Sequence, residues 1–124
     1  MATGKSTVAP LVAASLDRPF VDTDAQIVER AGMPIREIFE RHGERYFRKL
    51  EAEICVDLAA ETGLVVATGG GALLNADTLV AMSSTGMVAC LTASPTVLAS
   101  RLADGTAERP LASDWQVLYE QRKP

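Results

Sequence analysis

The first residues of the chain, Met-Ala-Thr-Gly-Lys-Ser-Thr, carry the last part of a phosphate-binding loop of the pattern G-x-x-x-x-G-K-[ST]. In such a loop a glycine, here Gly4, lets the backbone approach phosphate oxygens, and the amide groups that begin the next helix point at the anion. The ammonium group of Lys5 would reach the outer phosphates, and the hydroxyl of Ser6 would bind Mg²⁺. Because the leading glycine of the pattern is missing, this motif indicates phosphoryl-transfer chemistry only together with other residues.

Two carboxylates, Asp22 and Asp24, end the stretch 18–24, which is typical of a short strand. Residues i and i+2 of an extended strand share a face, so both carboxylates are expected to face one crevice beside the phosphate loop. One would serve the Mg²⁺ shell, and the other would accept a hydrogen bond from a substrate hydroxyl. The alternative is a solvated turn in which Asp24 caps the next helix.

Glycines and arginines supply two further candidate features. Three consecutive glycines at 69–71 weaken a strand or a helix, so they suit a place where the backbone approaches a ligand closely, although a flexible turn is the alternative. Guanidinium groups recognise carboxylates and phosphates in bidentate geometry. The arginines of interest are Arg48, Arg101, Arg109 and Arg122. Each of them could be an ordinary surface residue, and Arg48 could simply pair with Glu51 one helical turn later.

Helical patterns alternate with short apolar runs along the chain, which is typical of an α/β protein. Helices are expected over 4–16, 24–32, 33–63, 75–86 and 94–103, the third of them split at Gly43, and a further helix starts at Trp115. Strands are expected over 18–24, 64–68 and 87–91, the last two of them buried. The apolar side of the first helix comprises Val8, Leu11, Val12 and Leu16. The apolar sides of segment 33–63 include Ile35, Ile38, Phe39, Phe47, Leu50, Ile54 and Leu58.

The composition predicts one globular domain of 124 residues, with 48% hydrophobic and 23% charged residues. A formal net charge of −4 offers no basic surface to nucleic acid, so polynucleotide partners are not expected. The apolar runs are too short to span a bilayer, and no secretory signal is evident, so we expect a cytoplasmic protein without a membrane partner. Cys55 and Cys90 are expected to be buried reduced thiols.

Taken together, the motifs resemble those of one known family, the shikimate kinases, which have the P-loop nucleoside monophosphate kinase-like fold. The segments GKST, DTD, GERYFR..E, GGG, RPL and QRKP occur in that family's order and at close to its spacing. The resemblance implies a three-layer αβα fold with a parallel sheet of strand order 2-3-1-4-5, here lacking the first (central) and last strands. It also implies a single partial domain, residues 1–124, with substrate-binding helices at about 25–60 and a lid at about 103–114.

The resemblance further implies a role for each candidate residue. Three are expected to be catalytic: Lys5 as the phosphate lysine, Asp24 as the ligand of shikimate hydroxyls and candidate base, and Arg109 as the lid arginine. The other residues expected to bind ATP are Gly4, Ser6, Thr7 and Arg101, and the expected Mg²⁺ ligands are Ser6 and Asp22. Shikimate is expected to bind Asp24, Arg48, Gly69, Gly70, Gly71 and Arg122. Glu51 is expected to orient Arg48.

The implied reaction is transfer of the ATP γ-phosphoryl group to the 3-hydroxyl of shikimate, in the chorismate route to aromatic amino acids. ATP is then the co-substrate, Mg²⁺ the cofactor and the enzyme a monomer. The alternatives are another small-molecule kinase of this fold, such as a gluconate kinase, and a non-catalytic nucleotide-binding domain. Loss of a central strand removes ladder hydrogen bonds and aliphatic burial, so the chain by itself is expected to be an inactive fragment.

Overall fold

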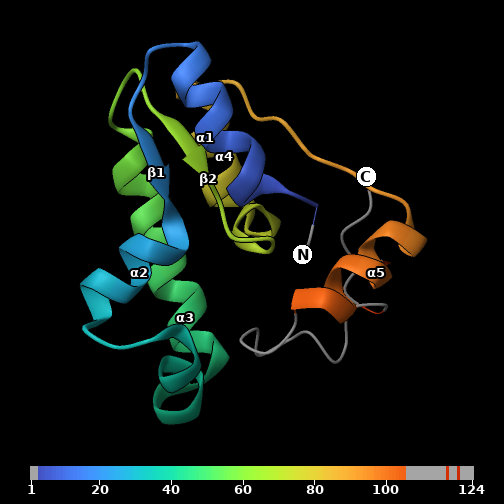
Figure 1. The fold of residues 1–124 in the computed structure, drawn as a ribbon. Helices are drawn as coiled ribbons and strands as arrows, with labels where there is room; N and C mark the ends of the chain where they lie inside the picture. Colours follow the sequence, from blue (N-terminus) through green and yellow to red (C-terminus); the bar gives the residue numbers. More distant parts are fainter. Residues whose placement is uncertain (1–2, 106–116, 118–119, 121–124) are drawn as a thin grey trace.

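The structure is a computed structural model that describes residues 3–105, 117 and 120. Its elements follow one another as Figure 1 shows. In chain order they are α1 (Lys5–Ser15), β1 (Phe20–Asp22), α2 (Thr23–Ala31), α3 (Ile35–Ala59), β2 (Val65–Ala67), the 3₁₀ helix η1 (Ala72–Leu74), α4 (Ala76–Thr85) and α5 (Pro95–Gly105). The expected alternation of helices and strands is therefore present in the described part of the chain.

Strands β1 and β2 pair in parallel. Their register sets Phe20 opposite Val65, Val21 opposite Val66, and Asp22 opposite Ala67. The chain returns from β1 to β2 through α2 and α3, the kind of long crossover that parallel strands require. Because the strands run in one direction, the residues that follow Asp22 and Ala67 leave the sheet at the same end.

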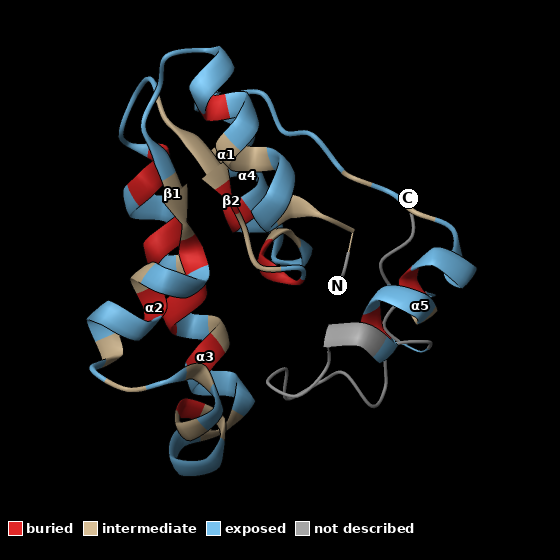
Figure 2. Cartoon of the chain, viewed as in Figure 1, coloured by how far each residue is buried: buried red, intermediate tan, exposed pale blue. Residues whose placement is uncertain are grey.

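A hydrophobic core lies between α2, α3 and the two strands. Val21 and Val66, which are opposite each other in the register, pack on this core together with Leu64. Figure 2 shows buried positions recurring along α3, where apolar residues return at helical spacing. The buried residues of this core are Ile27, Ile38, Phe47, Leu50, Ile54 and Leu58. The apolar residues predicted for segment 33–63 all belong to this core or pack against it, so that prediction is confirmed.

Helices α1 and α4 pack on the elements that surround this core, α1 on the strands and α4 on α3. Helix α1 contacts both strands and runs along their other side from α3 (Figure 1). Helix α4 packs against α3 and η1. Ala13 of α1 is buried, whereas Leu11 is 67% exposed and Leu16 is 52% exposed. The predicted apolar side of α1 therefore faces outward in the described structure.

Local signals mark several helix boundaries where the sequence predicts them, although α3 ends at Ala59 and not at the predicted Gly63. Gly32 lies in the left-handed region with φ 67° and ends α2, and Gly43 has φ 78° and interrupts α3. The side chain of Asn75 accepts a hydrogen bond from the Thr78 amide at 3.1 Å and caps α4. Ser94 precedes α5, and its hydroxyl accepts the Val97 amide at 3.4 Å.

Two predictions on segment 87–91 are wrong. The segment forms no strand, and Met87 is 96% exposed. A strand is stabilised by hydrogen bonds to a neighbour, and the described sheet pairs β1 with β2 alone. Cys90, in the same segment, is exposed, whereas Cys55 is buried as predicted.

No helix among the described residues is long and apolar enough to cross a membrane.

Candidate active site at the ends of the two strands

The segments that leave β1 and β2 are joined by a hydrogen bond. The backbone amide of Gly69 donates to the hydroxyl of Thr23 at 2.9 Å, and Thr23 is 0% exposed. Beyond the end of the ladder, this bond holds the glycine segment against the start of α2. The sequence reasoning did not single out Thr23, although its place between two candidate carboxylates directly after a strand was a usable signal.

Asp24 lies in the first turn of α2, so the prediction that it extends the strand is wrong. Asp22 is the N-cap residue of this helix, and its Oδ1 accepts the Asp24 amide at 2.8 Å. Helix formation begins at Thr23 because this cap satisfies an amide of the first turn. The two carboxylates are therefore not paired on one strand face, and Asp22, not Asp24, caps the helix.

Asp24 and the glycine segment nevertheless lie close together. A Cβ atom added to Gly69 would come within 3.4 Å of Asp24 Oδ1 and would clash with Glu51 Oε1. The absence of a side chain at Gly69 is thus what allows two carboxylates to approach the backbone here. The glycines thus permit close approach by side chains of this chain, and their close approach to a ligand stays a prediction.

Arg48 lies over the other end of the glycine segment. Its Nη1 would be 2.8 Å from a Cβ atom added to Gly71, and the same Nη1 donates to Glu51 Oε2 at 2.6 Å. Glu51 is 2% exposed, although it stands on the mainly apolar side of α3. Arg48 also pairs with the exposed Glu44 at 3.3 Å. Because Glu51 is buried, the Arg48–Glu51 pair is not the ordinary surface ion pair that was the alternative interpretation.

The start of α1 forms a second group of candidate residues. Gly4 is the N-cap with φ 97°, in the left-handed region that favours glycine. The ammonium group of Lys5 is 3.5 Å from the Thr3 hydroxyl. Arg101 of α5 also reaches this place, because its Nη1 would be 3.8 Å from a Cβ atom added to Gly4. A helix N-terminus bordered by two cationic side chains is suited to binding an anion.

The structure thus brings Asp24, Arg48 and Glu51 together around Gly69 and Gly71, and it brings Arg101 to Gly4 and Lys5. Gly70 is the exposed middle residue of the glycine segment, and Ser6 and Thr7 are exposed in the first turn of α1. Two expected arginines, Arg109 and Arg122, lie outside the described residues.

Oxygen donors that suit Mg²⁺ are present at the expected positions. Mg²⁺ takes few protein carboxylates and completes its shell with phosphate oxygens and water. The hydroxyl of Ser6 and the carboxylate of Asp22 are of this type, and Asp22 is held in place through the hydrogen bond to its Oδ1. Within the described part of the chain, no group of three or more His, Cys, Asp or Glu residues could hold a metal ion by itself.

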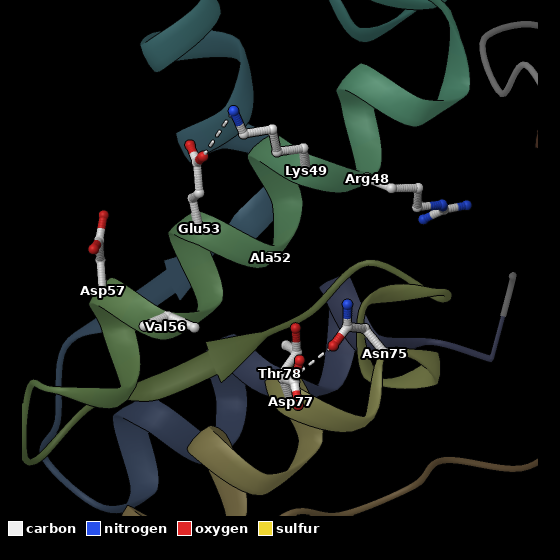
Figure 3. Close-up of a pocket in the computed structure, with 9 residues that line it drawn as sticks. All are labelled: Arg48, Lys49, Ala52, Glu53, Val56, Asp57, Asn75, Asp77 and Thr78. Carbon is white, nitrogen blue, oxygen red and sulfur yellow. Dashed lines mark hydrogen bonds and ion pairs between the residues drawn. The ribbon is translucent and has the colours of Figure 1, made fainter.

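A groove of about 480 Å³ lies between α3 and the start of α4 (Figure 3). Arg48 stands at its edge, and Figure 3 shows its side chain directed away from the Lys49–Glu53 ion pair, which measures 3.8 Å. The described residues that line it are Arg48, Lys49, Ala52, Glu53, Val56, Asp57, Asn75, Asp77 and Thr78. Since neither Asp24 nor a glycine is among them, this groove shares only Arg48 with the cluster around Gly69 and Gly71.

Cys55, which is buried in α3 one turn after Glu51, has a raised pKa. Burial, and secondly the carboxylate of Glu51 one turn earlier, raise the pKa of the Cys55 thiol to about 11. The thiol is therefore protonated at neutral pH and is a poor nucleophile.

The parallel strands, the glycine at the start of α1 and the cations around it define an α/β protein of the P-loop kinase fold. The sequence model of the shikimate kinase family, described as "SKI: Shikimate kinase", matches residues 1–123. The chain belongs to the shikimate kinase family. The resemblance noted from the motifs is thereby confirmed.

Known members of the family support this assignment. The chain is 53% identical to a shikimate kinase of Geobacter sulfurreducens over 90% of its own length and 61% of that protein, and 48% identical to one of Dechloromonas aromatica over 82% and 55%. It therefore spans less than two thirds of these relatives. A structure of shikimate kinase from Acinetobacter baumannii in complex with shikimate matches with a TM-score of 0.91 at 32% identity, over 98% of this chain and 71% of that one. The Aquifex aeolicus enzyme matches with a TM-score of 0.85 at 39% identity, over 98% and 74%.

Proposed function

We propose that the protein phosphorylates the 3-hydroxyl of shikimate with ATP. The observation that carries this proposal is the Arg48 guanidinium, held 2.6 Å from the buried Glu51 and placed across the glycine segment from Asp24. The Arg48 guanidinium can bind a carboxylate, and Asp24 can accept a hydrogen bond from a hydroxyl group. The glycine segment between them has no side chains, so the arrangement suits a small carboxylic acid that also bears hydroxyl groups. The family member from Acinetobacter baumannii is described as a complex with shikimate.

In this proposal Arg48 binds the shikimate carboxylate, and Gly69, Gly70 and Gly71 allow the ring to lie against the backbone. Asp24 accepts a hydrogen bond from a substrate hydroxyl and is the candidate base. By the family resemblance, Arg122 is the second arginine on the carboxylate. A guanidinium already oriented by Glu51 loses less freedom on binding, which favours affinity.

The ATP phosphates would lie at the start of α1. The amides that follow Gly4, the ammonium group of Lys5 and the guanidinium of Arg101 would bind them, with Thr7 in the same turn. Ser6 and Asp22 would hold Mg²⁺, which, when bound, supplies positive charge to the phosphate oxygens. Arg109 would approach the transferring phosphoryl group from the lid.

The reaction needs positioning more than covalent chemistry from the protein. The 3-hydroxyl oxygen forms a bond to the γ-phosphorus while the bond from that phosphorus to the bridging oxygen breaks, and ADP leaves. Asp24 takes the hydroxyl proton. Lys5 and Arg109 stabilise the charge that spreads over the transferred group, and closure of the lid keeps water from accepting the phosphoryl group.

The finer organisation is part of the proposal. The chain would form one domain in which helices at about 25–60 bind shikimate and a lid at about 103–114 closes over ATP, and most of that lid lies outside the described residues. A monomer acting in the cytoplasm, with no nucleic acid or membrane as partner, stays a prediction.

The test is to incubate the protein with ATP, Mg²⁺ and either shikimate, gluconate or a nucleoside monophosphate, and to follow ADP release and the ³¹P signal of a new phosphate ester. The prediction that this chain by itself is inactive is tested in the same assay, and any ester that does form should be that of shikimate alone. Arg48→Ala should abolish the shikimate response, and Lys5→Met should reduce ATP binding. An ester formed with gluconate would favour the other kinase activity. Nucleotide binding without any ester, in a protein that also fails to bind shikimate, would favour the non-catalytic domain.

A further inference from the structure

Thr23 connects two functional segments without being exposed to a substrate. It is the first residue of α2, directly before Asp24, and it is 0% exposed. Its hydroxyl accepts the Gly69 amide at 2.9 Å, which links positions 46 residues apart in the sequence. A side chain this deeply buried does not itself contact a ligand.

The strand register explains why this bond matters. Backbone pairing ends where Asp22 is opposite Ala67, so Thr23 leaves the ladder level with Thr68 and adjacent to Gly69. From this point the two segments separate, one into α2 and the other toward η1. The Thr23 hydroxyl accepts the Gly69 amide where a longer ladder would use a backbone carbonyl. The hydrogen bonding between the two segments thus continues one step beyond the sheet. Gly69 is also the residue whose added Cβ would approach Asp24 Oδ1 to 3.4 Å.

We propose that Thr23 is a positioning residue that sets the spacing between the Asp24 carboxylate and the glycine segment, and so holds the two sides of the shikimate hydroxyl site at a fixed distance. This inference rests on the proposed function for its ligand. The spacing itself follows from the Thr23 to Gly69 hydrogen bond. A threonine suits both demands of the position, because its hydroxyl is an acceptor and its methyl group fills buried space.

Two variants separate the hydroxyl from the methyl group. Thr23→Val keeps the shape and removes the acceptor, which leaves the Gly69 amide without this partner. Thr23→Ser keeps the acceptor and removes the methyl group. Thr78→Val is the matched control, because Thr78 is also a threonine with 1% exposure at a helix start, and it is not part of the Asp24 and glycine cluster.

The experiment measures three quantities on the full chain and each variant: hydrogen exchange of the Gly69 amide by NMR, and the dissociation constants of shikimate and of ATP. The melting temperature of each protein is recorded as a measure of its stability. For Thr23→Val we expect the hydrogen-exchange rate of the Gly69 amide to rise roughly tenfold, as for loss of one hydrogen bond. The shikimate dissociation constant should rise by roughly the same factor. The ATP dissociation constant should change by less than about twofold, and Thr23→Ser should stay within about threefold of the parent in all three. Thr78→Val should lower the melting temperature without a selective rise of the shikimate dissociation constant.

The outcomes are distinct. Unchanged Gly69 exchange in Thr23→Val, or an unchanged shikimate dissociation constant, overturns the inference. Equal losses in Thr23→Ser and Thr23→Val that track a lowered melting temperature also overturn it, because the residue would then act through packing. If the parent chain binds no shikimate, the proposed function fails, and the positioning of Gly69 by Thr23 is decided by amide exchange alone.

Discussion

The guanidinium of Arg48 is held over the glycine segment by the carboxylate of Glu51, which is 2% exposed and lies 2.6 Å away. The two residues are three apart on α3, so the helix itself places them side by side. Because the Glu51 carboxylate is buried, it keeps the guanidinium in one orientation. The exposed carboxylate of Glu44, 3.3 Å from Arg48 Nη2, contributes little to that orientation.

Glu51→Gln should therefore weaken shikimate binding while preserving the shape of the side chain. We expect the dissociation constant of shikimate, measured by calorimetry, to rise roughly tenfold or more, since a charge-assisted hydrogen bond is lost. Glu44→Gln is the control, and its effect should be less than about twofold, because exposed pairs contribute little. Equal effects of the two substitutions would contradict the orienting role of Glu51.

Gly71→Ala should displace Arg48. Its φ of −115° is open to alanine, so the expected loss comes from the 2.8 Å approach of the new Cβ to Arg48 Nη1 and not from backbone strain. We expect roughly tenfold weaker shikimate binding, or about 1.4 kcal/mol. The matched control is Gly86→Ala, where φ is −154° and the nearest atom to the new Cβ is 3.7 Å away. A Gly71→Ala protein that binds shikimate as tightly as the control would disprove the close approach.

Arg101→Ala should weaken ATP binding without affecting shikimate. The Arg101 guanidinium lies near Gly4, at the start of α1, where the phosphates are proposed to bind. We expect the ATP dissociation constant to rise roughly tenfold, as for loss of a charge-assisted contact. Arg18→Ala removes the same charge from an exposed position between α1 and β1, and it should leave ATP binding unchanged. Parallel losses in both variants would indicate a nonspecific effect of net charge.

Cys55 should make folding stability fall at alkaline pH. The pKa of its thiol rises from 9.0 to about 11 in the folded chain, mainly through burial, so the folded state holds the proton more tightly than the unfolded state. This contribution to the unfolding free energy is fully present below pH 9.0 and is lost as the pH rises toward about 11. Urea unfolding across that range should show the loss, and Cys55→Ala should show a smaller one.

Thiol labelling gives an independent check on both cysteines. At pH 8 the exposed Cys90 should react with iodoacetamide within minutes, whereas the buried Cys55 should react only after denaturant is added. Mass spectrometry of the two peptides separates the sites. Rapid labelling of Cys55 in the folded chain would show that the α3 core opens readily.

Features that depend on a few neighbouring residues were predictable. Gly32, Gly43, Asn75 and Ser94 mark helix boundaries through left-handed backbone or capping side chains, and these signals act within one turn. The apolar residues of segment 33–63 were assigned to the core by helical spacing alone. The phosphate-loop residues and the glycine triplet likewise predicted the kind of chemistry that is proposed, because their use depends on residue type.

The sequence by itself thus determined helices α1 to α5 to within a few residues, the core face of α3 and the list of candidate site residues. Only the tertiary structure decided that Asp24 begins a helix while Asp22 caps it, that Thr23 holds Gly69, and that segment 87–91 forms no strand. The physical reason is that these outcomes depend on which segments become neighbours. The register of β1 on β2 and the packing of α3 fix those distances, and no local pattern encodes them.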